Sequence, residues 1–474
     1  MKKLLYLLAV VLCLNAKAQT YVTIPDTNFV HYLKALVPSA MSGNQLDITN
    51  TLVTTTIKKI DVNTKQIADL SGIEYFTSLT WLDCGFNLFT SITALPPSLH
   101  QLYCNNNSIA SLPVLPNTLD TLFCSEIYQL TALPALPNSL MYLRCDYDGL
   151  TSLPTLPNSI KYIFCVGNSL HTLPTLPTSL TFLDCSYDSL TSLPALPNSL
   201  TSLSCTNNKL SSLPALPNSL TLLNCPTNSL TSLPTLPNSL VYFYCPNNLL
   251  PNLVPLPASL KSLDCSYNKL VSLPALPSML KGLSCGYNNL TGLPVLPDSL
   301  NYLQCNNNNI HCLPTLPNSI EPNSWVSPPV GCPPSICSGY WSRTLDFTNN
   351  SIYCLPNYID ATPNSADYNY NNRPALCNNG DPNNCAVTDG INKIANNNAI
   401  NIYPNPTKDI LNVELNMLNE KADLKLYDVN GNQVLSQTIY GNSSVDVSNL
   451  SAGVYNISIT NNQSVANKKL VIVK

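Results

Sequence analysis

Charged residues are scarce in this sequence. Asp, Glu, Lys and Arg make up 10% of its 474 residues, and 22 basic against 26 acidic residues give a formal net charge of −4. A nucleic-acid-binding protein needs clustered Lys and Arg to neutralise phosphates. The composition therefore excludes nucleic acid as the expected partner.

Histidine is also rare, and the acidic residues are dispersed. The four histidines are far apart in the chain: His31, His100, His171 and His311. A zinc site or a nucleophilic triad needs converging ligands or a base within hydrogen-bond reach, and a glycosidase needs a pair of carboxylates. We therefore expect a protein that is not an enzyme and that uses no metal and no cofactor.

Long apolar runs are missing, except at the start of the chain. Residues 1–18 contain Lys2 and Lys3, an apolar run from Leu4 to Leu14, and the sequence Ala-Lys-Ala at 16–18. This is the pattern of a secretory signal peptide with its cleavage site, and the run is too short for a transmembrane helix. We expect an exported mature chain without a transmembrane segment.

What the sequence does contain is a repeat marked by cysteine. Twelve of the 19 cysteines stand twenty residues apart, with one step of twenty-one: Cys84, Cys104, Cys124, Cys145, Cys165, Cys185, Cys205, Cys225, Cys245, Cys265, Cys285 and Cys305. A fixed period of this size predicts a solenoid, in which each repeat contacts only its neighbours.

The repeat from Leu200 to Ser219, LTSLSCTNNKLSSLPALPNS, shows how one unit folds. Leu203 and Cys205 are separated by one residue, which is the spacing of a short strand with one face inward. Asn208 follows, where an amide can satisfy the backbone of a tight turn. The two prolines of the LPxLP segment forbid a helix and favour an extended return on the outer side.

The frame LxxLxCxxNxLxxLPxLPxx resembles the bacterial leucine-rich repeat in its short, twenty-residue form, and it covers residues 57–320. The resemblance implies a mostly β, α/β-type right-handed solenoid, with a parallel sheet on its concave side and extended chain on its convex side.

Both ends of the repeat array depart from the frame. Residues 19–56 lack the repeat, and Asp26 there can cap a helix carrying Phe29 and Leu33, so we expect an N-terminal helical cap. A first repeat of twenty-two residues follows from Ile57. The repeat of Cys124 has the one extra residue and lacks the turn Asn, which predicts a local bulge.

Six further cysteines cluster after the regular repeats end. A degenerate last repeat begins at Leu345, and residues 321–385 otherwise read as an irregular C-terminal cap. Its candidate disulfide cysteines are Cys312, Cys332, Cys337, Cys354, Cys377 and Cys385. Six cysteines allow fifteen pairings, among which the sequence does not choose.

Beyond residue 385 the pattern changes twice. Residues 386–401 are rich in Asn and read as a linker. Residues 402–474 contain alternating segments separated by turns, including ILNVEL, LKLYDV, VLSQTIY, VYNISI and KLVIVK, which predict a small all-β sandwich.

Four landmarks of this last segment resemble the type IX secretion C-terminal sorting domain. They are YPNP at 403–406, LYDVNG at 426–431, LSAGVY at 450–455 and KLVIVK at 469–474. The resemblance implies an exported protein that passes through the periplasm and the outer membrane and is displayed on the cell surface or released. It also implies the type IX machinery as a partner.

The cysteine column is best explained by packing. Neighbouring parallel strands lie about 4.8 Å apart, whereas the Cβ atoms of a disulfide lie about 3.8 Å apart on converging bonds. We therefore expect buried free thiols that fill apolar positions. The alternatives are partial disulfide pairing and metal binding.

The residues one and three positions before each cysteine are not specified by the consensus and point away from the core. These two strand positions are rich in aromatic residues. We expect them to form a ligand-binding concave face: Trp81, Tyr103, Phe123, Tyr142, Arg144, Tyr162, Phe164, Phe182, Asp184, Tyr242 and Tyr244. Other aromatics come just after the cysteine: Phe86, Tyr147, Tyr187, Tyr267 and Tyr287. Cross-strand packing is the structural alternative for many of these rings.

Together these features predict a secreted, surface-displayed binding protein without catalytic activity. We expect a monomer that engages a protein or glycan on another cell, a host or a matrix. A structural surface or stalk component is one alternative, and a secreted effector is another. The sequence identifies neither the ligand nor whether the mature protein is anchored or released.

Overall fold

A computed structural model describes residues 19–320, 325–326, 342–343, 345–352, 354–355, 375–376, 400–415, 421–428, 432–440, 442–460 and 465–474. The predicted signal peptide at 1–18 and the predicted linker up to residue 399 lie outside these residues. The chain divides into two compact units, a repeat unit and a C-terminal unit.

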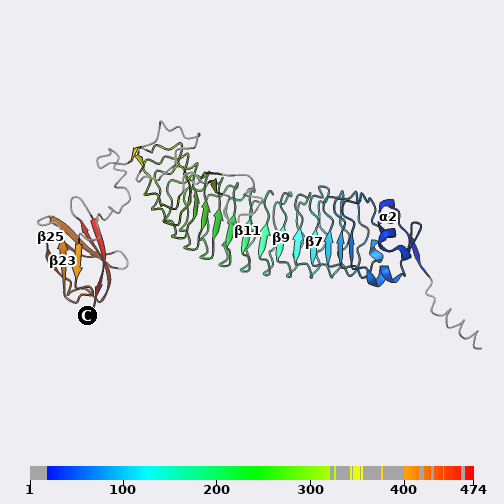
Figure 1. The fold of residues 1–474 in the computed structure, drawn as a ribbon, viewed down its shortest axis with the longest axis horizontal. Coiled ribbons are helices and arrows are strands. Elements are labelled where there is room, and N and C mark those ends of the chain that lie inside the picture. The colour runs from blue at the N-terminus through cyan, green and yellow to red at the C-terminus, as the bar shows by residue number, and fades with distance from the viewer. Residues whose placement is uncertain are drawn as a thin grey trace, which may run out of the picture. The chain divides into compact units, whose positions relative to one another are not determined.

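The repeat unit is built on one fourteen-stranded parallel sheet (Figure 1). Each strand pairs with the next repeat in register, as Leu183 does with Leu203. The strands are β4 (Lys59–Asp61), β5 (Trp81–Asp83), β6 (Gln101–Tyr103), β7 (Thr121–Phe123), β8 (Tyr142–Arg144), β9 (Tyr162–Phe164), β10 (Phe182–Asp184), β11 (Ser202–Ser204), β12 (Leu222–Asn224), β13 (Tyr242–Tyr244), β14 (Ser262–Asp264), β15 (Gly282–Ser284), β16 (Tyr302–Gln304) and β19 (Leu345–Asp346). The predicted parallel solenoid is confirmed.

Leucine and cysteine fill the interior of each repeat. In the repeat of Cys205, Leu200, Leu203, Cys205 and Leu210 are all fully buried, and the same pattern recurs along the array. All twelve cysteines of the column are free, buried thiols, as predicted. The thiols of Cys84 and Cys265 donate to strand carbonyls of the next repeat over 3.4 and 3.5 Å.

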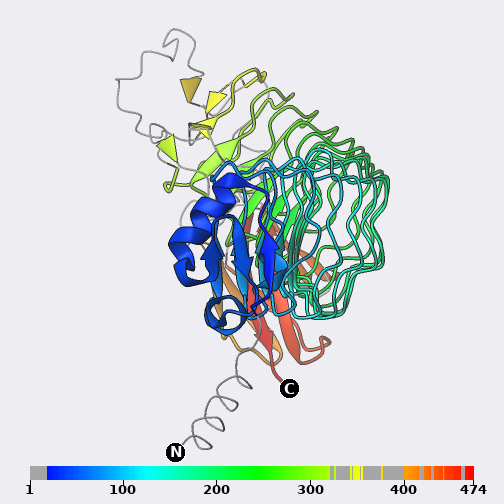
Figure 2. The ribbon, with the colours of Figure 1, turned by 90° about the vertical axis from the view of Figure 1, so that its right-hand side faces the viewer.

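The chain returns from strand to strand without a helix. Between Trp81 and Ile320 every residue is described and none is helical, in agreement with the prolines of each LPxLP segment. The returning chain lies opposite the sheet, as the end-on view shows (Figure 2). In most repeats a serine before the new repeat ties it to the previous one, and the hydroxyl of Ser219 donates to the carbonyl of Leu200 over 2.6 Å.

The turn asparagines join neighbouring repeats. The amide nitrogen of Asn208 donates to the carbonyls of Cys185 and Cys205, at 2.9 and 3.2 Å. Its oxygen accepts from the backbone N–H of Leu190 at 2.9 Å. Each asparagine therefore satisfies buried backbone groups of two repeats.

Two repeats have aspartate in this asparagine position. The carboxylate of Asp148 accepts from the N–H of Ile127 at 2.7 Å, and that of Asp188 accepts from the N–H of Leu170 at 3.0 Å. In both, the second carboxyl oxygen is buried without a hydrogen-bond partner. Burial raises the pKa of Asp148 to about 8 and that of Asp188 to about 7.

Short elements precede the first repeat. Helix α2 (Thr27–Leu36) begins after Asp26, whose carboxylate accepts from the N–H of Phe29 at 2.9 Å. Its other oxygen accepts from the N–H of Ala68 in the first repeat at 2.8 Å. Helix α2 lies across the N-terminal end of the solenoid (Figure 2), with Phe29 and Leu33 fully buried.

The sequence predicted this helix but not the strands around it. An antiparallel sheet is formed by β1 (Tyr21–Thr23), β2 (Met41–Ser42) and β3 (Gln45–Asp47). Single turns follow in η1 (Pro38–Ala40), in the π-helical η2 (Leu52–Thr56) and in η3 (Ile73–Tyr75), which belongs to the first repeat. Strands of two or three residues are too short to show an alternating pattern.

Both irregular repeats identified in the sequence, that of Cys124 and the last one at Leu345, are present. The extra residue of the Cys124 repeat lies in a turn after the strand, where the N–H of Leu130 donates to the carbonyl of Ile127 at 2.8 Å. The degenerate last repeat is present as β19, and the amide of Asn350 donates to the carbonyl of Cys305 at 2.9 Å.

Little of the predicted C-terminal cap is described. Its described pieces are β17 (Trp325–Val326), β18 (Ser342–Arg343), β20 (Cys354–Leu355) and β21 (Ala375–Leu376). Cys312, one of the six candidate disulfide cysteines, is disulfide-bonded, as predicted. Cys354 lies in β20, whereas Cys332, Cys337, Cys377 and Cys385 lie outside the described residues.

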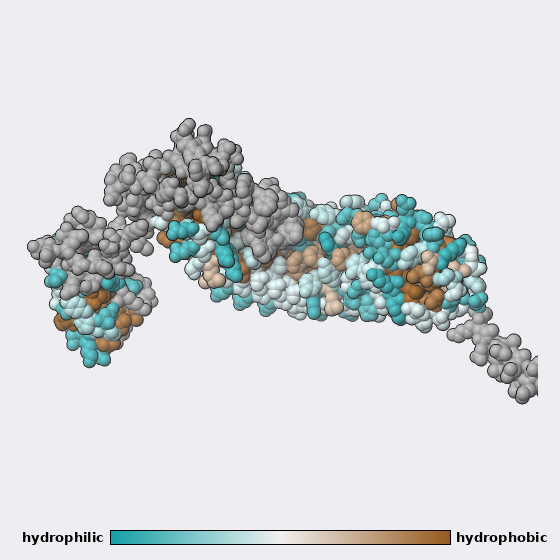
Figure 3. All heavy atoms as spheres, in the orientation of Figure 1, coloured by the Kyte–Doolittle hydropathy of each residue, from teal (hydrophilic) through white to brown (hydrophobic). Residues whose placement is uncertain are grey.

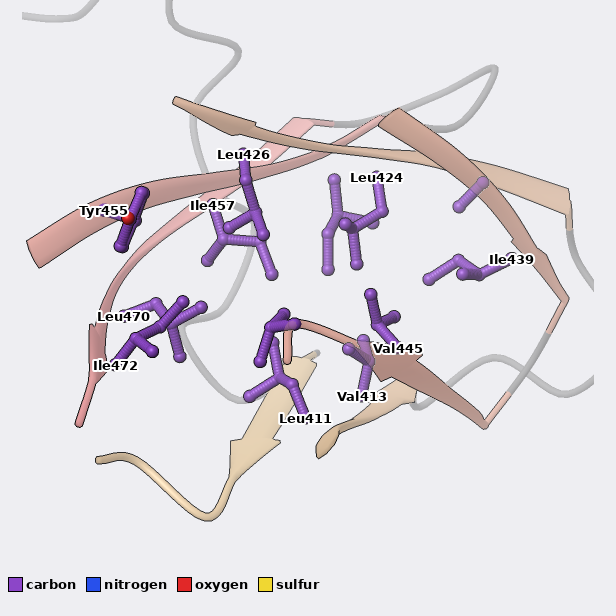
Figure 4. Close-up of a cluster of buried hydrophobic side chains, with 13 residues drawn as sticks. Leu411, Val413, Leu424, Leu426, Ile439, Val445, Tyr455, Ile457, Leu470 and Ile472 are labelled. Atoms are coloured by element: carbon purple, nitrogen blue, oxygen red, sulfur yellow. The ribbon is translucent and has the colours of Figure 1, made fainter. Parts of the chain in front are cut away.

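The C-terminal unit contains two antiparallel sheets. One has β22 (Ile400–Tyr403), β23 (Ile410–Leu415) and β26 (Ser443–Asp446). The other has β24 (Lys421–Tyr427), β25 (Gln433–Tyr440), β27 (Gly453–Thr460) and β28 (Val465–Ile472). Their inward side chains, among them Leu411, Leu424 and Ile457, form one buried cluster (Figure 4). The predicted sandwich is present, and its first strand, β22, begins at Ile400, two residues before the start predicted for the domain.

Because Asp148 and Asp188 replace the turn asparagine and each has a buried carboxyl oxygen, we expect the stability of the fold to decrease as pH rises. Because the pKa of Asp148 is higher in the folded chain than in the unfolded chain, its contribution to stability is fully present below pH 4 and is lost as pH rises toward 8, by at most about 1.4 kcal/mol per pH unit. We expect Asp148→Asn to match the parent at pH 4 and to exceed its free energy of unfolding by about 2–4 kcal/mol at pH 8.

Urea unfolding followed by circular dichroism at both pH values measures this difference. Asn208→Asp is the matched converse variant, because it should introduce the same loss of stability with rising pH at a position that now has an amide. An Asp148→Asn variant with the same advantage at both pH values would contradict the assignment.

The cysteine column predicts a second behaviour. Burial raises the pKa of all twelve thiols, so the reactive thiolate is suppressed in the folded chain. We expect a thiol reagent to leave these twelve cysteines unmodified in the native protein and to modify all of them in denaturant without reductant. Mass spectrometry of both samples counts them, and a column that stays unmodified in denaturant would be oxidised.

Candidate functional site

The candidate site is the concave face of the parallel sheet. In each three-residue strand the middle side chain points into the core, as Leu82 does in β5, and the two flanking side chains lie on the concave face. All eleven residues predicted for the site occupy these flanking positions of β5 to β10 and β13. Where the view of Figure 3 shows its surface, hydrophobic and polar residues are interspersed on the repeat unit.

The rings of the first six of these strands form one continuous contact series, here called the aromatic strip: Trp81, Tyr103, Phe123, Tyr142, Tyr162, Phe164 and Phe182. Centroid distances along it are 5.5 Å from Trp81 to Tyr103, 4.9 Å on to Phe123 and 5.0 Å on to Tyr142. They continue at 5.5 Å to Phe164 and 4.6 Å to Phe182. Tyr162 lies beside Tyr142 at 5.8 Å.

The rings at the C-terminal half of the strip are stacked. Phe123 and Tyr142 are inclined by only 8°, Tyr142 and Phe164 by 30°, and Phe164 and Phe182 by 29°. Tyr142 and Phe164 therefore each have a stacked ring before and after them along the array, which leaves their electropositive edges for other contacts. The pairs of Tyr103 with Trp81 and with Phe123 are tilted instead, by 42° and 30°.

Two cations contact the aromatic strip. The ammonium of Lys59 lies 3.8 Å from the ring centroid of Trp81 at the N-terminal end. The guanidinium of Arg144 lies 5.7 Å from Phe123 and 5.6 Å from Phe164. Arg144 also pairs with the buried Asp146 over 2.6 Å, which orients it while 45% of its side chain stays exposed.

Lys59 and Asp146 were not predicted as part of the site. Lys59 pairs in register with Trp81 and so occupies a concave position of the first repeat. It was missed because that repeat has Val62 where the others have cysteine. Alignment on the buried Ile60 would have found it.

Asp184 closes the strip at its C-terminal end. Its carboxylate accepts from the hydroxyl of Ser186 at 2.6 Å and from its N–H at 3.2 Å. Burial raises the pKa of Asp184, against the lowering effect of these hydrogen bonds. The next strand has Ser202 and Ser204 at the concave positions, so the series of rings ends at Phe182.

Tyr242 and Tyr244 are separate from the aromatic strip. Two repeats with Ser202, Ser204, Leu222 and Asn224 lie between them and Phe182. Tyr244 is only 7% exposed, and Asn224, its register partner, is fully buried. The predicted face is therefore two regions, of which the N-terminal one has the continuous series of rings and the exposed Tyr162.

No helix in the described part of the chain has the length and hydropathy needed to cross a bilayer. Among the described residues, no group of three or more His, Cys, Asp or Glu side chains is arranged to hold a metal ion.

Comparison with known proteins identifies the C-terminal unit first. Residues 401–473 match the family described as the secretion system C-terminal sorting domain. This family marks proteins exported by the type IX system to the cell surface or the medium. A search of proteins with curated functions finds no match to the chain.

Solved structures similar to this one are leucine-rich-repeat proteins. YopM from Yersinia enterocolitica is 33% identical over 52% of this chain and 63% of its own, which is less than two thirds of its length, with a TM-score of 0.43. YopM from Yersinia pestis is 26% identical over 70% and 97%, with a TM-score of 0.45.

The functional domain of InlJ from Listeria monocytogenes, which includes a cysteine ladder, is 19% identical over 96% of this chain and 100% of its own, with a TM-score of 0.50. This likeness concerns the fold. The repeat unit therefore has the fold of leucine-rich-repeat proteins, built from twenty-residue repeats with in-register parallel strands. The chain carries at residues 401–473 the secretion system C-terminal sorting domain, which marks proteins exported to the cell surface or the medium.

Proposed function

We propose that this protein is a non-catalytic binding protein, displayed at or released from the cell surface, whose aromatic strip contacts a macromolecular ligand. The observation that carries the proposal is the continuous series of rings from Trp81 to Phe182 on an accessible sheet face. An aromatic surface of this kind, with an exposed arginine in it, has the composition of an interface centre.

The covered ring faces support a protein ligand for this surface. A sugar ring or a quaternary ammonium is recognised by stacking on the electron-rich face of an aromatic ring. Tyr142 and Phe164 are stacked on a ring at each side, so at the middle of the strip the ligand meets ring edges. Carbonyl oxygens and aliphatic side chains of a protein are complementary to such edges, and Arg144 adds a donor for a carboxylate.

The architecture supports adhesion or recognition at a surface. The sorting domain delivers the chain to the exterior, and the solenoid then offers a long, preformed face whose backbone is fixed by repeated hydrogen bonds. A ligand that binds such a face does not have to order it first, which favours affinity. The residues from 19 to 56 are proposed to cover the end of the solenoid that would otherwise expose strand edges.

The strip predicts the residues on which binding depends. We expect the triple substitution Tyr162→Ala, Phe164→Ala and Phe182→Ala to weaken ligand binding at least about a hundredfold, because it removes three adjacent anchors from the C-terminal end of the strip. The partner is first captured with the full mature chain and identified, and calorimetry then gives Kd for parent and variant. Tyr128→Ala, which removes a 73% exposed ring outside the aromatic strip, is the matched control.

Unchanged affinity in the triple variant, with the parent's circular dichroism spectrum, would refute the role of the strip. Equal losses in the triple variant and in Tyr128→Ala would refute it as well, because binding would then respond to any exposed ring.

The sorting domain predicts where a truncated chain stops. We expect deletion of residues 402–474 to trap the protein in the periplasm, since the segment read by the outer-membrane machinery is then missing. Protease accessibility on intact cells and fractionation measure the location. Fusion of residues 401–474 to an unrelated periplasmic protein is the matched gain-of-function control, and surface display of the deleted chain would contradict the assignment.

A further inference from the structure

The two sheets of the C-terminal unit have four edge strands. The three-stranded sheet ends in β22 and β26, and the four-stranded sheet ends in β25 and β28. An edge strand has a row of backbone N–H and C=O groups without a partner strand, and natural proteins protect such rows with short strands, charges, prolines or bulges. An edge that lacks this protection is open to pairing with a strand of another chain.

Three of these edges are protected by their length or their sequence. β22 and β26 have four residues each, Pro404 directly follows β22, and β26 includes Asp446. β28 has eight residues, but its sequence includes Lys468 and Lys469. Each of these strands is therefore a poor template for an added strand.

A further segment pairs with the end of β28. The N–H of Thr407 donates to the carbonyl of Val471 at 2.9 Å, and the N–H of Val473 donates to the carbonyl of Thr407 at 2.8 Å. The N–H of Val471 donates to the side-chain oxygen of Asn405 at 2.9 Å. The outer side of β28 is therefore occupied along its last residues.

The edge at β25 has the least protection. Its eight residues, QVLSQTIY, include no charged residue, no proline and no glycine. A register shift skips Val434 and leaves Leu435–Tyr440 as a regular antiparallel partner of β24. Six of the eight residues are exposed, whereas Ile439 points into the buried cluster of the sandwich (Figure 4).

The backbone groups of Ser436 and Thr438 point to the outer side of β25. The N–H of Tyr440 donates to the hydroxyl of Ser443 at 3.4 Å, and the carbonyl of Tyr440 accepts from that hydroxyl at 3.1 Å. Both groups of Tyr440 are therefore turned away from its register partner, Lys421. Antiparallel pairs alternate between bonded and non-bonded, so Thr438 and Ser436 have the same orientation as Tyr440.

These groups form an open row. Among the described residues, no strand pairs with β25 on that side, and both Ser436 and Thr438 are exposed. They present two backbone donors and two backbone acceptors to solvent. An extended chain laid beside β25 would satisfy all four groups and add a fifth strand to the sheet.

The size of the row favours a transient partner over a second copy of this chain. A stable association involves about 20–30 residues from each partner. The regular part of β25, Leu435–Tyr440, supplies only six. A cargo that is carried through the outer membrane has to be bound and then released, which a short row of main-chain hydrogen bonds allows.

We propose that the open edge of β25 pairs with an extended, uncharged strand of the type IX export machinery while the protein is exported. This proposal rests on the export role of the sorting domain at residues 401–473. Main-chain pairing supplies the affinity, and the absence of charge along β25 excludes a partner strand chosen by charge pairing.

Photocrosslinking of the full chain in its native host tests the contact. The photoreactive residue p-benzoylphenylalanine replaces Ser436 on the open edge or, as the matched control, Lys408, which is exposed in the same unit but lies outside the strands. We expect a crosslink from position 436 to an outer-membrane component of the type IX system, identified by mass spectrometry. No crosslink at 436, or an equal yield at 408, would overturn the proposal.

The substitution Thr438→Pro tests whether the open row is needed. It removes an outward N–H and adds a ring there, and proline is tolerated on an edge strand where its nitrogen faces solvent. We expect the surface-displayed fraction of the full chain to fall at least about tenfold. Thr438→Ala is the matched control, because it loses the hydroxyl bond to Asp423 but keeps the N–H, and it should be displayed like the parent.

Display of Thr438→Pro at the parent's level, or equal retention of Thr438→Pro and Thr438→Ala, would also overturn the proposal. Protease resistance of the purified chain shows whether the C-terminal unit of Thr438→Pro folds, and if it does not, the crosslink at 436 decides. The sorting assignment fails separately. If Thr438→Pro is displayed while the deletion of residues 402–474 is retained in the periplasm, only the edge proposal is wrong.

Discussion

The amide of each turn asparagine bonds to the repeat that carries it and to the repeat before it. Asn208 does so through the carbonyls of Cys185 and Cys205 and the N–H of Leu190. Because these groups are buried, each must be paired, and the pairing recurs only if successive repeats have the same path. The identical path then keeps the strands in register and the leucines in one interior column.

Much of the fold follows from that constraint, which is why it could be predicted from the sequence. The spacing of Leu203, Cys205 and Asn208 defines the strand and its turn, and the prolines define the return. The degenerate repeat at Leu345 was recognisable because Asn350 kept its place. The strands β1 to β3 and β22 were missed, since very short or isolated segments have no periodicity to reveal them.

The candidate site could be predicted only as a set of positions. The consensus leaves the residues flanking Leu183 and its equivalents free to vary, so their location on one face is fixed by the pleat. Which rings touch depends on side-chain directions across neighbouring strands, which spacing does not determine. For the same reason the burial of Tyr244 and the seating of Lys59 over Trp81 became apparent only in three dimensions.

The twenty-residue period also has a genetic consequence. Neighbouring repeats such as those of Cys185, Cys205 and Cys225 share 13 of 20 residues from one to the next, so their coding segments can recombine out of register. An exchange of this kind adds or removes one whole coil and keeps the hydrogen bonds that the shared frame makes, such as those of the turn asparagines. The length of the exposed aromatic surfaces can therefore change in whole steps, and selection can adjust the reach of the molecule without first having to rebuild its core.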